Sequence, residues 1–169
     1  MLKKNKFIVA VYVDNIAGVL TRVTAMFTRR GFNIDALAVG ETERSEYSRI
    51  TITMSGDELA REQIINQLKK LHNVKKVDIL DQEESVKREL LLIKVRYSSE
   101  TRADIITASE VYRGKVIDYT SDAMCIEVTG EPSKVDAFIG LMVPFGVIEM
   151  CRTGLVALER GKTSLLDRT

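Results

Sequence analysis

Residues 7–31 read FIVAVYVDNIAGVLTRVTAMFTRRG, and the architecture of the chain can be built from this stretch. Its first part, Phe7–Val13, is a continuous apolar run of strand length, as expected for a central strand covered on both faces. The turn Asp14–Gly18 then breaks the run with residues that favour turns and helix caps. From Val19 the apolar residues recur at the spacing of an amphipathic helix, which Gly31 ends.

The alternation of strands and helices continues up to residue 80. Asn33–Gly40 is predicted to be a second strand. Tyr47–Met54 alternates apolar and polar side chains, which predicts a half-exposed third strand. A second helix follows, capped by Asp57 or Ser55, and Val74–Leu80 supplies a fourth strand. The order β-α-β-β-α-β is that of the ferredoxin-like split unit.

The polar joint Asp81–Ser85 is the best candidate for a domain boundary. Beyond it the same order repeats, with strands predicted at 89–97, 115–120, 123–129 and 147–152 and helices at 101–112 and from Pro132 onward. Gly154–Thr169 is expected to be a partly polar tail. We therefore predict an α+β protein of two ferredoxin-like βαββαβ modules, with domains at residues 1–80 and 86–169.

The composition is that of a folded protein, with 45% hydrophobic residues, 29% charged residues and a net charge of +1. No concentrated run of basic residues indicates binding to nucleic acid. The apolar run Phe7–Val13 is short for a signal core, and no apolar stretch reaches the roughly 20 residues that span a bilayer. Cys125 and Cys151 lie in apolar runs without a CxxC motif and are predicted to be buried, reduced thiols. We expect a cytoplasmic protein without membrane association.

Residues that would support catalysis are missing from the pattern. The chain has a single histidine, His72, which is expected to be an exposed residue at a helix end. There is no clustered set of metal ligands, no glycine-rich phosphate loop and no G-x-S-x-G elbow. We nominate no catalytic residue and no metal ligand.

The turn Asp14–Gly18 is the most informative candidate site, and two interpretations of it stay open. The first N–H groups of a helix can bind a carboxylate, and the Asn15 side-chain oxygen could accept a hydrogen bond from a ligand ammonium group. Gly18 would let a ligand approach the backbone. Alternatively, Asp14 or Asn15 merely caps the helix, and Asn33, which follows Gly31, merely forms a turn.

In their order along the chain, the motifs resemble the acetolactate synthase (acetohydroxyacid synthase) small regulatory subunit, whose first domain is an ACT domain. The resemblance spans about residues 5–162. It rests on N-x-x-G-x-L-x-R-V at 15–23, F-x-x-R-G-x-N-I at 27–34, R-G-x-(I/V)-(I/V)-D at 113–118 and Arg-Thr-Gly at 152–154. The chain departs from the family at Asp14, where Glu is frequent, and 42–47 is a variable loop.

The resemblance implies a subunit of branched-chain amino acid (valine, isoleucine, leucine) biosynthesis that is not catalytic alone. Such a subunit binds a separate catalytic large subunit, activates it and confers feedback inhibition by valine. It has no cofactor of its own, because thiamine diphosphate belongs to the catalytic subunit. ACT domains of this kind pair side by side, which implies a homodimer with the amino-acid effector at its interface. The two apolar faces of Phe7–Val13 are compatible with such pairing.

The resemblance also assigns residues to the effector site. Asn15 and Gly18 match the valine-binding turn, and Asn33 matches the family's second asparagine. As a hypothesis, the valine carboxylate would meet the amides near Ala17 and Gly18, and its ammonium group would meet Asn15 or Asn33. The isopropyl group would enter an apolar pocket near Val13, Leu20 and Ile34.

Three other classes of protein share part of this pattern. A stand-alone ACT-type amino-acid sensor or co-regulator would have the first module, although the chain has no recognisable helix-turn-helix segment. An RNA-recognition domain needs exposed aromatic residues on its central strands, whereas the third strand presents Arg49, Thr51 and Thr53. An acylphosphatase-like enzyme needs an arginine-containing anion loop where this chain has Asp14-Asn15-Ile16.

Overall fold

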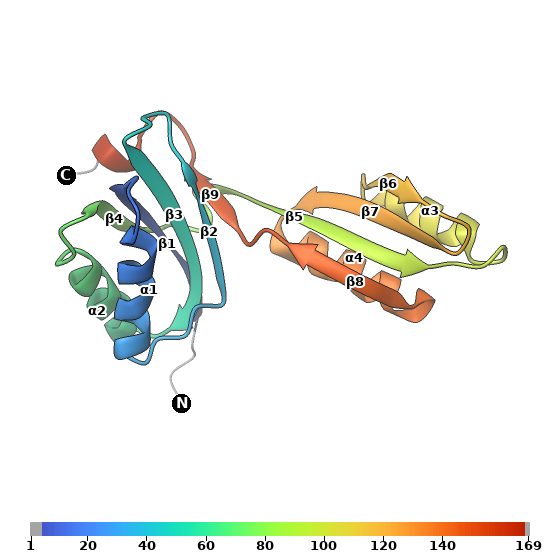
Figure 1. Ribbon diagram of the computed structural model, residues 1–169, viewed down its shortest axis with the longest axis horizontal. Coiled ribbons are helices and arrows are strands. Elements are labelled where there is room, and N and C mark those ends of the chain that lie inside the picture. Colours follow the sequence, from blue (N-terminus) through green and yellow to red (C-terminus); the bar gives the residue numbers. More distant parts are fainter. Residues whose placement is uncertain (1–4, 168–169) are drawn as a thin grey trace. The chain divides into compact units, whose positions relative to one another are not determined.

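The computed structural model describes residues 5–167, which form two compact units (Figure 1). The first unit contains the chain up to Val86 together with the segment from Leu155 onward, and the second contains Lys87–Gly154. Both units have the predicted βαββαβ order. In the first unit the elements are β1 (Asn5–Asp14), α1 (Val19–Arg29), β2 (Ala36–Glu41), β3 (Tyr47–Gly56), α2 (Glu58–Leu68) and β4 (Val74–Leu80). Its antiparallel sheet has the strand order β2-β3-β1-β4.

The first sheet is organised around β1, whose side chains point alternately to its two faces. Phe7, Val9, Val11 and Val13 join one buried cluster with the apolar stripes of α1 and α2. The residues that alternate with them, Ile8, Ala10 and Tyr12, point to the opposite face and belong to a second buried cluster there. The prediction that β1 is covered on both faces is therefore confirmed within a single chain.

The second face of this sheet is covered by the C-terminal segment of the same chain, which contains β9 (Val156–Glu159) and a short 3-10 turn, η2 (Leu165–Asp167). Leu155, Ala157 and Leu165 are buried against the sheet. The Arg49 guanidinium holds the segment by donating from Nη2 to the carbonyl oxygen of Ala157 at 2.9 Å.

This arrangement corrects two predictions. Residues 155–167 belong to the first unit and not to a second domain that runs over 86–169. The polar face of β3 is also less exposed than predicted, since Thr51 is only 4% exposed and Arg49 and Thr53 are partly buried. The local alternation of side chains indicates a strand with two different faces, but it carries no information about a distant segment that covers the polar one.

Short polar contacts set the ends of two elements. Asn33 Nδ2 donates to Asp35 Oδ1 at 3.2 Å, and the Asp35 N–H donates to the Thr53 carbonyl at 2.9 Å. Residues 33–35 thus form an irregular segment before the strand, and β2 begins at Ala36, later than predicted. Asp57 is the cap of α2, with its carboxylate accepting from the Ala60 N–H at 2.9 Å.

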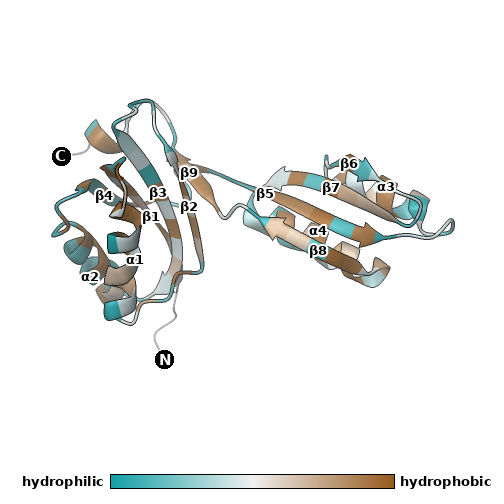
Figure 2. Ribbon diagram, viewed as in Figure 1, coloured by the Kyte–Doolittle hydropathy of each residue, from teal (hydrophilic) through white to brown (hydrophobic). Residues whose placement is uncertain are grey.

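The second unit repeats the architecture with its own core. Its elements are β5 (Ser85–Arg96), α3 (Arg102–Val111), β6 (Lys115–Tyr119), β7 (Ala123–Gly130), α4 (Pro132–Met142), a 3-10 turn η1 (Val143–Phe145) and β8 (Val147–Arg152). The strand order is β6-β7-β5-β8, and apolar residues run along the central strand β5 (Figure 2). Leu91, Ile93 and Val95 of β5 pack on α3 and α4.

Charged side chains and two cysteines lie around the edge of this core. Arg152 makes a two-point contact with the buried Glu89 carboxylate at 2.6 and 2.7 Å, and also contacts Asp136 at 2.8 Å. Cys125 and Cys151 are free thiols. Cys151 is exposed, which contradicts the prediction, because its register partner Leu92 alternates with the core residues of β5 and lies on the other face.

The packing of the C-terminal segment on the second face of the sheet should contribute to the stability of the first unit. We expect Leu165→Ala to lower the free energy of opening of the first unit by about 2–4 kcal/mol, because it removes buried methyl groups from the cluster around Ile8. Native-state hydrogen exchange of the β1 amides measures this quantity. Leu158→Ala is the matched control, since Leu158 is 61% exposed and its truncation should change the value by less than about 0.5 kcal/mol. Equal effects of the two variants would contradict the packing of the segment.

Candidate functional site

The turn between β1 and α1 presents unbonded backbone N–H groups at the positive end of a helix. Gly18 is the residue that precedes α1, and its φ of +82° is in the left-handed region that favours glycine. Among residues 5–167, no hydrogen-bond acceptor faces the N–H groups of Ala17 and Gly18. Ile16, Ala17 and Gly18 are all exposed. The turn can therefore receive an anionic group from solvent.

Asn15 links this turn to the connection between β2 and β3. Its Nδ2 donates to the Ser45 carbonyl at 3.0 Å and, at 3.4 Å, to Glu41 Oε1. Its Oδ1 accepts from the Ser48 hydroxyl at 2.9 Å. Asn15 therefore does not cap α1, and the carboxamide oxygen keeps a second lone pair for a ligand donor.

Asp14 anchors the turn on the other side and does not cap the helix either. Its carboxylate accepts from Asn73 Nδ2 at 2.9 Å and pairs with Lys75 Nζ at 3.0 Å. Asn73 in turn accepts from Arg22 of α1. The hydrogen bond from Asn73, followed by that from Lys75, lowers the pKa of Asp14 below its ordinary value of 3.8. The interpretation of the turn as a simple helix cap is therefore wrong.

The other predicted site residues form two groups. Val13 is buried in the core, and Leu20 lies beside the turn with 38% of its surface exposed. Asn33 and Ile34 follow the other end of α1, whose 11 residues span about 16 Å. Asp35, next to them, accepts from Ser55, a residue that pairs with the start of β1. A single chain thus does not bring Asn33 and Ile34 to Asn15 and Gly18.

Some contacts of the turn were not predicted from the sequence. Ser48, Glu41 and the Ser45 carbonyl reach Asn15 from positions 26–33 residues away, and Asn73 reaches Asp14 from 59 residues away. No motif of short spacing signals such pairs. Ser48 and Asn73 lie within residues 5–162, over which the family resemblance extends, but outside the motifs named for it.

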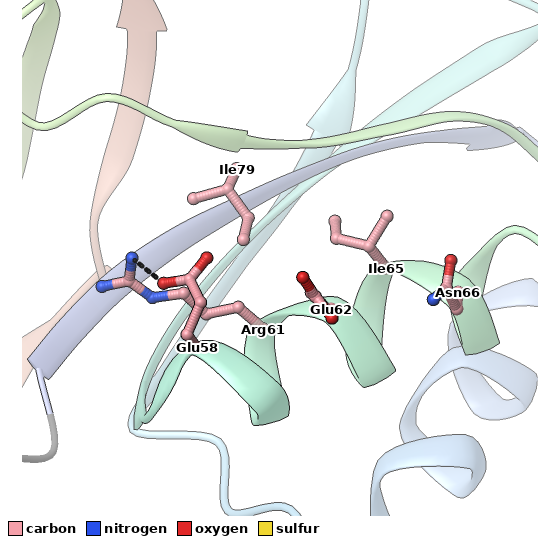
Figure 3. Close-up of a pocket in the computed structure, with 6 residues that line it drawn as sticks. All are labelled: Glu58, Arg61, Glu62, Ile65, Asn66 and Ile79. Atoms are coloured by element: carbon pink, nitrogen blue, oxygen red, sulfur yellow. Dashed lines mark hydrogen bonds and ion pairs between the residues drawn. The ribbon is translucent and has the colours of Figure 1, made fainter. Parts of the chain in front are cut away.

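A groove of about 340 Å³ lies between α2 and Ile79 of β4 (Figure 3). Glu58 and Arg61 at its edge form an exposed ion pair at 3.2 Å, and Ile65 contributes an apolar wall. Within residues 5–167 no group of His, Cys, Asp and Glu side chains is arranged to hold a metal ion. No helix in this part of the chain is long and apolar enough to cross a membrane.

The sheet face that an RNA-recognition domain would offer to RNA is occupied in the first unit. Leu155 and Leu165 cover it, and Tyr12, the aromatic residue on its central strand, is only 5% exposed. This observation argues against the RNA-binding alternative for that unit.

Comparison with known proteins gives consistent matches along both units. A family model described as the AHAS small subunit-like ACT domain matches residues 9–76, and one described as the small subunit of acetolactate synthase matches residues 88–161. A probable acetolactate synthase small subunit of Archaeoglobus fulgidus is 47% identical over 156 residues, covering 92% of this chain and 98% of that protein. The acetolactate synthase small subunit of Mycolicibacterium smegmatis is 45% identical over 152 residues, covering 90% and 89%.

A solved structure supports the same assignment. The crystal structure of the acetolactate synthase small subunit from Thermotoga maritima superposes with a TM-score of 0.88 at 42% identity, covering 94% of this chain and 99% of that one. Identity at this level over nearly the whole length establishes common descent together with the common fold. The chain belongs to the acetolactate synthase small-subunit family.

Proposed function

We propose that this chain is the regulatory subunit of an acetolactate synthase in branched-chain amino acid biosynthesis. In this proposal it binds the catalytic large subunit, raises its activity and mediates feedback inhibition by valine. The catalytic subunit carries the thiamine diphosphate, and this chain contributes no catalytic group. The observation that carries the proposal is the pair of unbonded N–H groups in the turn of Ala17 and Gly18, in a member of this family.

The chemistry of the turn suits a free amino acid. The valine carboxylate would accept from the N–H groups of Ala17 and Gly18, assisted by the dipole of α1. The ammonium group would donate to the remaining lone pair of Asn15 Oδ1. Leu20, which is partly exposed beside the turn, would contact the isopropyl group. Val13 lies below this surface and would support it as part of the core.

A homodimer would complete the site. Because Asn15 and Asn33 lie at opposite ends of α1, one effector can contact both only if they come from two chains. β2 is an edge strand that follows Asn33, and its Val39 is 50% exposed. Pairing of two chains along this edge, related by a two-fold axis, would place Asn33 and Ile34 of one protomer near Asn15 and Gly18 of the other.

Such a shared site provides a route for regulation. An effector held by two protomers favours one arrangement of the dimer, and a catalytic subunit bound to the dimer would respond to that arrangement. The effector needs different affinities for two states, with typical coupling of about 1–3 kcal/mol. The alternative function is a stand-alone amino-acid sensor or co-regulator, which would bind valine without a large subunit.

The role of the turn can be tested by calorimetry. We expect Asn15→Ala to weaken valine binding by at least about tenfold, because the ammonium group loses a hydrogen bond to its oxygen acceptor. Isothermal titration of valine into both proteins measures the change. Asn66→Ala is the matched control, since Asn66 is an exposed asparagine on α2. Unchanged affinity in the folded Asn15→Ala protein would remove this turn from the site.

The two-chain site has its own test. Asn15→Ala and Asn33→Ala homodimers should each lose valine binding, because every site then lacks one asparagine. After the two proteins are unfolded together and refolded, half of the dimers are mixed and each holds one intact site. The mixture should therefore regain about a quarter of the sites. Calorimetric stoichiometry measures this recovery. A mixture that binds no better than its parents would show that the two asparagines do not act across a dimer.

The partner is tested by association with the large subunit. We expect the tagged chain to retain the acetolactate synthase large subunit of the same organism in a pull-down, to raise its activity and to make it sensitive to valine. Asn15→Ala should retain association and activation but lose the sensitivity to valine. Failure of the wild-type chain to bind or to change the activity of the large subunit would favour the stand-alone sensor.

A further inference from the structure

A second cavity with the chemistry of an amino-acid site lies on the opposite face of the first sheet. It has a volume of about 230 Å³ and lies between that face and the C-terminal segment of the chain. Its walls include Tyr12 of β1, Arg49 of β3, Leu80 of β4 and Leu165 of η2. The volume is below the range of about 300–1,000 Å³ that is typical of drug-sized ligands, so the cavity suits a smaller molecule.

Two cationic side chains, Arg49 and Lys162, line this cavity, and Arg49 has a buried hydrogen-bond donor without an acceptor. Nη2 donates to the Ala157 carbonyl, while Nε is buried without an acceptor. The guanidinium carbon lies 5.8 Å from the centre of the Tyr12 ring. Within residues 5–167 no carboxylate lies within ion-pair distance of Arg49. A half-buried guanidinium with spare donors is the side chain best suited to bind a carboxylate, because its N–H groups can donate to both carboxylate oxygens.

The same cavity is lined by two carboxylates, those of the exposed Glu43 and of Glu159, and by apolar walls. Glu43 accepts a hydrogen bond from the Tyr12 hydroxyl at 3.1 Å, which leaves its carboxylate with further lone pairs. Leu80 and Leu165 are almost completely buried, at 3% and 5% exposed. Leu158 stands at the rim with 61% of its surface exposed. Basic, acidic and leucine side chains thus surround one small space.

We propose that this cavity binds a small α-amino acid in its zwitterionic form. The ligand carboxylate accepts from the terminal nitrogens of Arg49, the ammonium group donates to Glu43, and an aliphatic side chain packs on Leu80 and Leu165. The site is distinct from the turn of Asn15 and Gly18, which lies at the end of β1. An occupied cavity ties the C-terminal segment to the sheet, because its ligand contacts both.

The experiment uses the full chain carrying Asn15→Ala, so that binding at the turn does not contribute. Millimolar L-leucine is titrated while the backbone amide signals of Tyr12, Arg49 and Leu165 are followed by NMR. Leu158→Trp, added at the exposed rim, fills the cavity without touching the core, and Arg49→Met removes the guanidinium. Leu59→Trp is the matched control, because Leu59 is 63% exposed on α2 and lies elsewhere.

We expect leucine to shift these signals in the Asn15→Ala protein and in its Leu59→Trp derivative, and Leu158→Trp to abolish the shifts. Arg49→Met should weaken binding by at least about tenfold. L-Leucinamide, which lacks the carboxylate, and 4-methylpentanoate, which lacks the ammonium group, should also bind at least about tenfold more weakly. Arg49→Met also removes a contact to Ala157, and the Leu158→Trp variant keeps the test independent of that loss.

Three results would overturn the proposal. These are an absence of shifts near the cavity, shifts that persist unchanged in Leu158→Trp, and binding of 4-methylpentanoate as tight as that of leucine, which would indicate a simple anion site. The proposed effector site at the turn fails by a different result, namely valine affinity that is unchanged by Asn15→Ala. The two proposed sites are therefore tested independently of each other.

Discussion

The burial of β1 on both faces is the constraint on which the first unit depends. A strand whose alternating side chains are all apolar must have a cover on each side, and the helices of a βαββαβ unit supply only one. In this chain the second cover is the C-terminal segment, with Leu155, Ala157 and Leu165 packed on Ile8 and Ala10. The first unit is thus assembled from both ends of the chain, with the second unit inserted between them in the sequence.

The candidate effector site is a consequence of how β1 ends. The positive φ of Gly18 turns the chain sharply into α1 and leaves the N–H groups of Ala17 and Gly18 without acceptors. The side chains that could have capped the helix are held elsewhere, Asp14 by Asn73 and Lys75, and Asn15 by the connection between β2 and β3. Long-range contacts therefore keep the start of the helix open to a ligand.

The half-buried Arg49 on the second face shows how a covering segment changes the environment of a polar side chain. Arg49 belongs to the polar side of β3 and would be solvated in an isolated unit. Beneath the C-terminal segment its Nε loses access to water without gaining an acceptor, and burial lowers the pKa of the guanidinium. Glu43, Tyr12 and the leucines then gather around it as a defined cavity. The unused donors are what make this cavity a candidate site.

Periodicity and turn chemistry were sufficient to predict the order of elements and to name Asp57 as one of two candidate caps of α2, because these depend on neighbours within a few residues. Four features were not predictable in this way. They are the burial of Thr51, the later start of β2, the exposure of Cys151 and the location of the C-terminal segment. Each results from contacts between residues far apart in sequence, such as Arg49 with Ala157. The local sequence pattern predicts which face of a strand is apolar. Which segment covers that face depends on tertiary contacts with residues far away in the sequence, and these exist only in the folded chain.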